Sequence, residues 1–304
     1  MISICIPVYN FEVVAFIKQI HTQFLETGKT FEIIVADDGS NKKYLSQYDK
    51  IRELSAIRLI LAESNLGRSK IRNMLVEKAQ FENILFCDCD SGIVNESFAE
   101  TYLKAIENNY NCVFGGRVYP IDAPDGKELH WKVGSIRESL AAEERAKDPY
   151  RFFMTNNFLI KKKLFQDVSF DESLCGYGYE DSFFSLMLKS KGYSINHINN
   201  PLVHLQLEKN EVFLKKTREA LDNLFSLSQK IENGAENIKV LRVYRTLKKF
   251  KLIRLVCFLY KKNYSFLVNH LSENSPNLYL FDFYKLGYFS IQYDEKMKKD
   301  AVMK

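Results

Sequence analysis

Two aspartates at the end of an apolar run are the clearest sign of chemistry in this chain. Residues 83–92 read Asn-Ile-Leu-Phe-Cys-Asp-Cys-Asp-Ser-Gly, a pattern typical of a buried strand that ends at Asp88. Side chains alternate along a strand, so Asp88 and Asp90 should face the same side. Two carboxylates so close repel each other unless a cation lies between them, and oxygen ligands with open positions suit Mg²⁺ or Mn²⁺. Such a pair alone is a weak signal, because solvated turns often contain it.

A second acid pair, Glu180 and Asp181, follows a loop of glycines and aromatics and precedes an apolar run at helical spacing. This position at a helix start stabilises an ionised carboxylate through the helix dipole. A carboxylate there could accept a proton from a substrate hydroxyl. From position alone, an ordinary acid at a helix N-terminus is the more frequent alternative.

The first part of the chain must place these acids, and it alternates strand-like and helix-like segments. We expect strands at residues 3–9, 31–36, 57–61 and 84–87, with helical segments at 11–26, 41–53 and 67–80 between them. Such alternation indicates a mostly parallel sheet with helices on both faces, in which ligands bind at the carboxyl ends of the strands. The acidic and polar loops fall at those ends. After about residue 210 the pattern is helical.

Charge divides the chain at the same point. Residues 211–304 hold 18 Lys and Arg against 10 Asp and Glu, whereas residues 1–210 hold 25 against 28. We therefore expect a domain of residues 1–210 and a mainly helical, basic extension of residues 211–304. The six cysteines show no CxxC spacing, and residues 1–7 lack the features of a signal peptide, so we expect a reducing, cytoplasmic location.

Four motifs in the first ninety residues give a more specific interpretation when they are read together. In order they are Ile6-Pro7-Val8-Tyr9-Asn10, Ala36-Asp37-Asp38-Gly39-Ser40, Asn65-Leu66-Gly67 with Arg72-Asn73, and Asp88-Cys89-Asp90. This order resembles the family 2 glycosyltransferases, inverting enzymes of the GT-A fold that use nucleotide sugars. The resemblance covers residues 1 to about 210. It implies an α/β GT-A fold, a nucleotide-sugar donor and a Mn²⁺ or Mg²⁺ cofactor.

The resemblance also implies a donor site. Pro7 and Tyr9 would give the base a flat apolar contact, and Asp38 would accept from a base N–H, which favours a UDP-sugar. Asp37 would be structural, since Asp-Asp-Gly-Ser is also typical of a turn that caps a helix. The expected nucleotide-binding residues are Pro7, Tyr9, Asp38, Asn65, Gly67, Arg72 and Asp88. The charges of Arg68 and Lys70 should be solvated.

Metal and catalytic roles follow from the same resemblance. Asp90 would be the direct metal ligand, and His204 would complete the metal site, although a lone His after an apolar pair is just as often structural. Asp181 would be the catalytic base and Glu180 would orient the acceptor. Trp131, Asn156 and Asn157 would contact the donor or acceptor sugar, with a core role for Trp131 as the alternative.

Residues 239–262 hold nine Lys and Arg, no acid, and apolar residues about every three positions. We expect an amphipathic helix that either packs on the catalytic domain or lies on an anionic membrane surface, which would make the protein peripheral to the inner face of the cell membrane. No recognition motif accompanies the charge, so we expect no nucleic-acid partner.

The sequence therefore predicts a metal-dependent transfer of a sugar from a nucleotide sugar to a glycan or lipid-linked hydroxyl. One alternative is a nucleotidyltransferase, but that class needs a Gly-rich basic loop where Tyr9-Asn10-Phe11 stands. The other is a non-catalytic nucleotide-sugar binder, which would not be expected to keep Asp38, Asp90, Glu180 and Asp181.

Overall fold

A computed structural model of the protein describes residues 1–173, 176–230 and 238–302. The chain forms two compact units. The first holds Met1–Pro120, the segment that begins at Arg137, and Glu180–Gln206; the second holds Ile121–Ile136, a short stretch that ends at Tyr179, and the chain from Leu207 onward. Compactness does not show that either part folds alone, so the division into domains of residues 1–210 and 211–304 stays a prediction.

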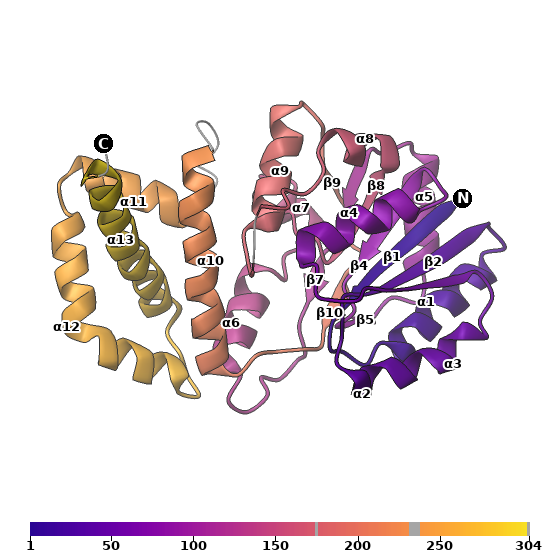
Figure 1. The fold of residues 1–304 in the computed structure, drawn as a ribbon, viewed down its shortest axis with the longest axis horizontal. Helices are drawn as coiled ribbons and strands as arrows, with labels where there is room; N and C mark the ends of the chain where they lie inside the picture. Colours follow the sequence, from indigo (N-terminus) through magenta and orange to yellow (C-terminus); the bar gives the residue numbers. More distant parts are fainter. Residues whose placement is uncertain (174–175, 231–237, 303–304) are drawn as a thin grey trace. The chain divides into compact units, whose positions relative to one another are not determined.

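A mostly parallel sheet is the centre of the first unit (Figure 1). Its strands, in spatial order, are β3 (Ile57–Leu61), β2 (Phe31–Asp37), β1 (Ile2–Val8), β4 (Asn83–Cys87), β8 (Asn157–Lys161), β6 (Cys112–Phe114) and β9 (Asn196–His197). All neighbours pair in parallel except β8, which is antiparallel to both β4 and β6. The expected fold class is therefore confirmed.

Helices cover both faces of this sheet (Figure 1). They are α1 (Val14–Glu26), α2 (Lys42–Leu45), the 3₁₀ helix η1 (Ser46–Tyr48), α3 (Asp49–Arg52), α4 (Arg68–Lys78), α5 (Phe98–Glu107), α7 (Ala142–Arg145), α8 (Lys162–Asp167) and α9 (Glu180–Ser190). Successive side chains of β1 point to opposite faces of the sheet and so pack against both layers of helices. Ile4 and Ile6 are buried in the apolar cluster with α1 and α5, whereas Cys5 is buried in the cluster with α4 and α8.

A second, three-stranded sheet has the order β5 (Ser91–Ile93), β10 (Leu202–His204) and β7 (Arg117–Val118). Strand β10 pairs antiparallel with β5, where His204 lies opposite Ser91, and parallel with β7, where Leu202 lies opposite Arg117. These pairings bring together three segments that are far apart in the sequence. The short strands are therefore the elements that assemble the site.

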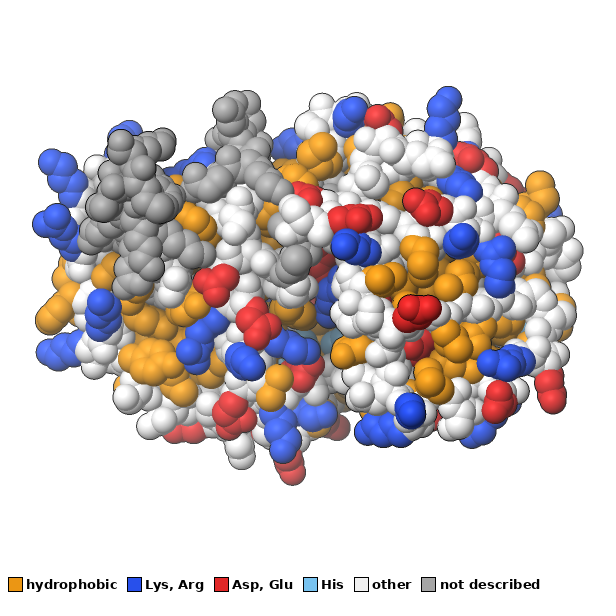
Figure 2. All heavy atoms as spheres, viewed as in Figure 1, with side chains coloured by type: hydrophobic (Ala, Val, Ile, Leu, Met, Phe, Trp, Pro, Cys, Tyr) orange, Lys and Arg blue, Asp and Glu red, His pale blue; other side chains and the backbone are white. Residues whose placement is uncertain are grey.

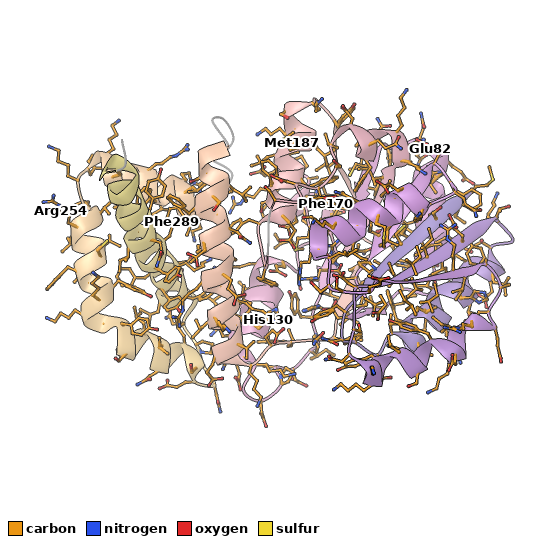
Figure 3. All side chains as sticks on the ribbon, viewed as in Figure 1. Glu82, His130, Phe170, Met187, Arg254 and Phe289 are labelled. Atoms are coloured by element: carbon orange, nitrogen blue, oxygen red, sulfur yellow. The ribbon has the colours of Figure 1, made fainter. Side chains whose placement is uncertain are left out.

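The second unit is helical. It contains α10 (Asn210–Lys230), α11 (Lys239–Lys249), α12 (Ile253–Ser272), α13 (Leu278–Val302) and all but the last residue of α6 (Glu128–Arg137). Its core joins Leu129 and Val133 of α6 to residues of α10, α12 and α13. Phe289 of α13 is fully buried and lies 5.4 Å from Tyr244 of α11, ring centre to ring centre (Figure 3). Aromatic rings supply much of the apolar area buried here.

The basic stretch 239–262 differs from the single helix that we expected. It is divided between α11 and α12, with a break at residues 250–252. The break contains Lys251 with φ of +60°, a left-handed conformation that a non-glycine residue seldom adopts. Among the described residues, no helix is both long enough and apolar enough to cross a membrane.

Candidate active site

Asp88 lies directly after β4, where it is held between two arginines. Arg72 Nη2 donates to Asp88 Oδ1 at 2.7 Å, and Arg117 Nη2 lies 3.6 Å from Asp88 Oδ2. The backbone N–H of Asp88 donates to the carbonyl of Asn156 at 2.9 Å, which extends the pairing of β4 with β8 by one residue. Both carboxylate oxygens are thus oriented by charged groups, and the side chain is fixed at the carboxyl end of the sheet.

Arg72 is almost completely buried on α4, with its guanidinium 5.8 Å from the ring centre of Phe170. Its Nη1 also donates to the carbonyl of Arg68 at 3.3 Å. In this arrangement the side chain positions Asp88. A direct contact between Arg72 and a diphosphate stays a prediction.

Asp90 and His204 form the second polar pair of the site. The Leu205 N–H donates to the Asp90 carbonyl at 2.8 Å, and the pairing of β5 with β10 places His204 Nδ1 3.5 Å from Asp90 Oδ2. Asp90 Oδ1 is buried and has no hydrogen-bond partner among the described residues. Burial alone would raise the pKa of Asp90, but His204 and the charges of Arg117 and Arg68 outweigh it and lower that pKa.

This pair fits a divalent cation in part. A buried carboxylate oxygen without a partner and an imidazole nitrogen close to the other oxygen are suitable donors for Mn²⁺ or Mg²⁺. Within the described chain, no group of three or more His, Cys, Asp or Glu side chains could hold a metal ion. An ion here would take its remaining ligands from the substrate and water.

Asp38 connects the end of β2 to the loop before α4. Its Oδ1 accepts from the Leu66 N–H at 2.6 Å and its Oδ2 from the Gly67 N–H at 3.1 Å. Burial raises the pKa of Asp38, while these two N–H donors oppose the rise. A carboxylate can accept about four hydrogen bonds, so each Asp38 oxygen keeps acceptor capacity for a ligand.

Asp37, in contrast, is used inside the protein. It accepts from the Ser40 N–H at 2.7 Å and from the Tyr48 hydroxyl at 2.5 Å. Gly39 follows with φ of +73°, and a Cβ there would lie 2.6 Å from the carbonyl carbon of Ser64. The turn therefore requires glycine, because the loop before α4 passes against its backbone.

The loop after β1 lies beside this turn. The Asn10 N–H donates to Ser40 Oγ and the Asn41 N–H to Asn10 Oδ1, both at 2.8 Å. Tyr9 is about half exposed there and Pro7 is partly buried. Asn65 donates from its side chain to the Asp38 carbonyl at 3.2 Å. Tyr9 and Asp38, proposed for base recognition, thus lie in loops that are bonded to one another, and Pro7 lies near the end of β1.

The Glu180–Asp181 pair begins α9. Arg68 is exposed to solvent, as we expected, but its Nη1 also lies 3.1 Å from Glu180 Oε1, an ion pair that we did not expect. Burial would raise the pKa of Glu180, but Arg68 and Arg72 more than offset it. Asp181 Oδ1 accepts from the Ser182 N–H at 2.7 Å. Burial, followed by the negative charge of Glu180, raises the pKa of Asp181 to about 7.

Sequence reasoning missed Arg117, Glu138 and Tyr119. Arg117 Nη1 lies 3.6 Å from Glu138 Oε2, the Tyr119 hydroxyl donates to the same oxygen, and the Tyr119 ring lies edge-on to His204 at 5.6 Å. Arg117 lies in the two-residue strand β7, Tyr119 directly follows it, and Glu138 directly follows α6, in a segment without clear periodicity. No pattern in the sequence distinguishes them from surface charges.

The three residues expected to contact sugars have different surroundings. Asn157 is fully buried and both ends of its amide are bonded inside the protein, to Tyr102, Gly116 and Asn200, so we do not carry it into the proposed site. Asn156 is also buried, but its amide N and O have no hydrogen-bond partner among the described residues. Trp131 lies partly buried on α6, in the second unit.

Comparison with known proteins identifies the class. The model of the Glycosyl transferase family 2 matches residues 3–171, more than half of the chain, and the chain belongs to this family. A mannosyltransferase from Pyrobaculum calidifontis, solved with GDP-Man and Mn²⁺, aligns with 97% of this chain and 86% of its own at a TM-score of 0.61. At 13% identity this likeness shows the fold alone.

Curated relatives agree with the family. The uncharacterized glycosyltransferase YfnE of Bacillus subtilis is 25% identical over 62% of this chain and 60% of its own length. The putative teichuronic acid biosynthesis glycosyltransferase TuaG of the same organism is 28% identical over 49% of this chain and 58% of its own. The chain thus spans less than two thirds of the length of these relatives.

Proposed function

We propose that the protein is an inverting glycosyltransferase that moves a sugar from a nucleotide sugar to a hydroxyl group of a glycan or a lipid-linked acceptor. The observation that carries this proposal is that two carboxylates of the first unit, those of Asp90 and Asp181, have surroundings that shift their pKa values in opposite directions. Asp90 has a lowered pKa and stays ionised, whereas Asp181 has a pKa raised to about 7. Two acids tuned in opposite directions suit cation binding and proton transfer in one site.

The donor would bind at the carboxyl ends of β1, β2 and β4. Tyr9 and Pro7 would contact the face of the base, and the free acceptor capacity of Asp38 suits a uracil N–H, so the donor we propose is a UDP-sugar. Asn65 and Gly67 hold the loop that Asp38 anchors. Asp88, fixed by Arg72 and Arg117, would accept from the ribose hydroxyls.

Asp90 and His204 would hold Mn²⁺ or Mg²⁺. When bound, the ion supplies positive charge against the diphosphate that leaves. Asp181 would accept the proton of the acceptor hydroxyl while the acceptor oxygen bonds to the anomeric carbon and the bond from that carbon to the phosphate oxygen breaks. Glu180, held by Arg68, would orient the acceptor. Displacement in one step from the opposite face inverts the anomeric configuration.

A donor panel tests this proposal. The purified protein is mixed with Mn²⁺ and each of a set of UDP-, GDP-, dTDP- and CMP-sugars, and thermal unfolding and slow donor hydrolysis are measured. We expect one UDP-sugar to raise the midpoint of unfolding, and Asp90→Ala to abolish this shift. Asp122→Ala, at an exposed position, is the matched control.

Two results would contradict parts of the proposal. Stabilisation only by a GDP-, CMP- or dTDP-sugar would refute the role given to Asp38. Absence of any response across the panel, with the control variant folded, would refute donor binding itself.

A further inference from the structure

Helix α12 has two apolar faces: one packs inside the helical unit, and the other is exposed in the part of the chain that the structure describes. Ile253, Val256, Tyr260, Leu267 and Leu271 are buried against the rest of the helical unit. A helix that contributes to a core through a single face would be expected to carry polar residues on the other side. The outer side of α12 does not follow this rule.

Large apolar side chains project from that outer side and from the break before it. Phe250 is 66% exposed, and Phe258 and Phe266 are each 59% exposed. The remaining members of this surface are Leu252, Leu255 and Leu259. Positions 252, 255, 259 and 266 are spaced by three, four and seven residues, so they share one face of the helix. We call these six residues the outer apolar stripe.

Basic side chains accompany the stripe. Residues 239–262 contain nine Lys and Arg and no Asp or Glu. Exposed members next to the stripe in the sequence are Lys249, Lys251, Arg254, Lys261 and Lys262. Arg254 points away from the helices of its unit (Figure 3), and hydrophobic and basic side chains alternate over α12 at the left of Figure 2.

Two acidic side chains near these helices, among those that the structure describes, are paired with residues outside the basic border. Asp282 of α13 lies 2.7 Å from Lys239 Nζ and 3.4 Å from Lys285 Nζ, and Glu273 lies 3.4 Å from His270. The positive charge beside the stripe is therefore not cancelled by these acids. A surface that combines exposed aromatic and leucine side chains with a one-signed basic border is complementary to an anionic lipid interface.

We propose that the outer apolar stripe and its basic border bind the surface of an anionic lipid bilayer, with α12 parallel to the membrane plane. Phe250, Phe258 and Phe266 enter the headgroup region, and Lys251, Arg254 and Lys262 contact lipid phosphates. Phe250 and Leu252, which flank the break at Lys251, are exposed directly before the start of α12. The stripe belongs to the second unit and the proposed donor residues belong to the first, so the proposal does not depend on the proposed catalytic function.

Vesicle sedimentation tests the proposal with the full chain. The protein is incubated with vesicles of phosphatidylcholine alone and with vesicles containing 30% phosphatidylglycerol, at low salt. We expect it to sediment with the anionic vesicles and to be released by high salt. Each basic residue near an anionic surface contributes about a fivefold gain in partitioning, so the triple variant K251Q/R254Q/K262Q should lose about 100-fold.

The matched control is K42Q/K50Q/K163Q, which removes the same charge from exposed positions of the first unit. A second variant, F258S/F266S, should also lose binding while its circular dichroism and thermal unfolding stay unchanged, because both side chains are exposed. The proposal is overturned if the wild-type chain does not sediment with anionic vesicles, or if K251Q/R254Q/K262Q and the control bind alike. It is also overturned if light scattering shows a dimer that F258S/F266S dissociates and vesicles have no effect, since the stripe is then an interface between copies.

Discussion

Replacing Asp181 by Asn tests whether the pKa of the proposed base is raised in the folded protein, through both activity and stability. Burial and the Glu180 charge raise the pKa of Asp181 from 3.8 to about 7. The folded protein therefore binds this proton more tightly than the unfolded chain does. The destabilising effect of the ionised carboxylate is absent at low pH, grows as the pH rises from about 4, and is complete above about 7.

The size of the effect follows from the shift. About three pKa units correspond to about 4 kcal/mol at most. The side chain is partly exposed, so solvent screens part of this energy, and we expect Asp181→Asn to raise the free energy of unfolding by about 1–3 kcal/mol at pH 8. The gain should be smaller at pH 5. For a chain of this size each kcal/mol raises the unfolding midpoint by about 2 °C.

Activity should change in the opposite direction. Loss of a general base typically lowers kcat by about 10²–10⁴-fold. The assay pairs calorimetric unfolding at pH 5 and pH 8 with transfer or donor hydrolysis, and Asp122→Asn serves as an exposed control. A variant that keeps nearly full transfer activity, or one that is no more stable than the wild type at pH 8, would refute the reasoning.

Three further predictions follow from the same site. The kcat/KM of the wild-type protein should rise about tenfold per pH unit below pH 7 and level off above it, because Asp181 must be deprotonated; a flat profile from pH 5 to 8 would exclude it as the base. Gly39→Ala should lower the free energy of unfolding by about 2–4 kcal/mol, since its Cβ would collide with Ser64. Gly28→Ala, with open space around it, should lower the same free energy by only about 1 kcal/mol. Chemical denaturation measures both. Arg72→Lys should lower the free energy of unfolding by about 1–3 kcal/mol and raise the donor KM, because Asp88 loses its 2.7 Å partner. Arg52→Lys, at an exposed position, should change neither the free energy of unfolding nor the donor KM.

The sequence allowed the fold to be predicted as far as local patterns extend. Apolar runs and helical spacing located β1, β2, β3 and β4, and the family motifs fall at their carboxyl ends. The antiparallel insertion of β8 between β4 and β6 could not be predicted, because strand order depends on long-range pairing that no local pattern specifies.

The same limit applies to the site. Asp90 and His204 are brought together by the pairing of three-residue strands, which are too short to give a periodic signal. Arg117, on the short strand β7 beside them, reaches Asp88 only through this assembly, and Glu138 in turn lies 3.6 Å from Arg117. The break at Lys251 was also hidden, since neither Gly nor Pro marks it and lysine seldom adopts a positive φ.

The most direct test of the central claim is the rate of donor hydrolysis as a function of Mn²⁺ concentration, with the UDP-sugar that best stabilises the protein. We expect a rate that saturates with Mn²⁺ for the wild type, and no metal-dependent rate for Asp90→Ala although that variant is folded. Equal rates for the two proteins at every Mn²⁺ concentration would contradict the assignment of Asp90 and His204 as the cation site of a glycosyltransferase.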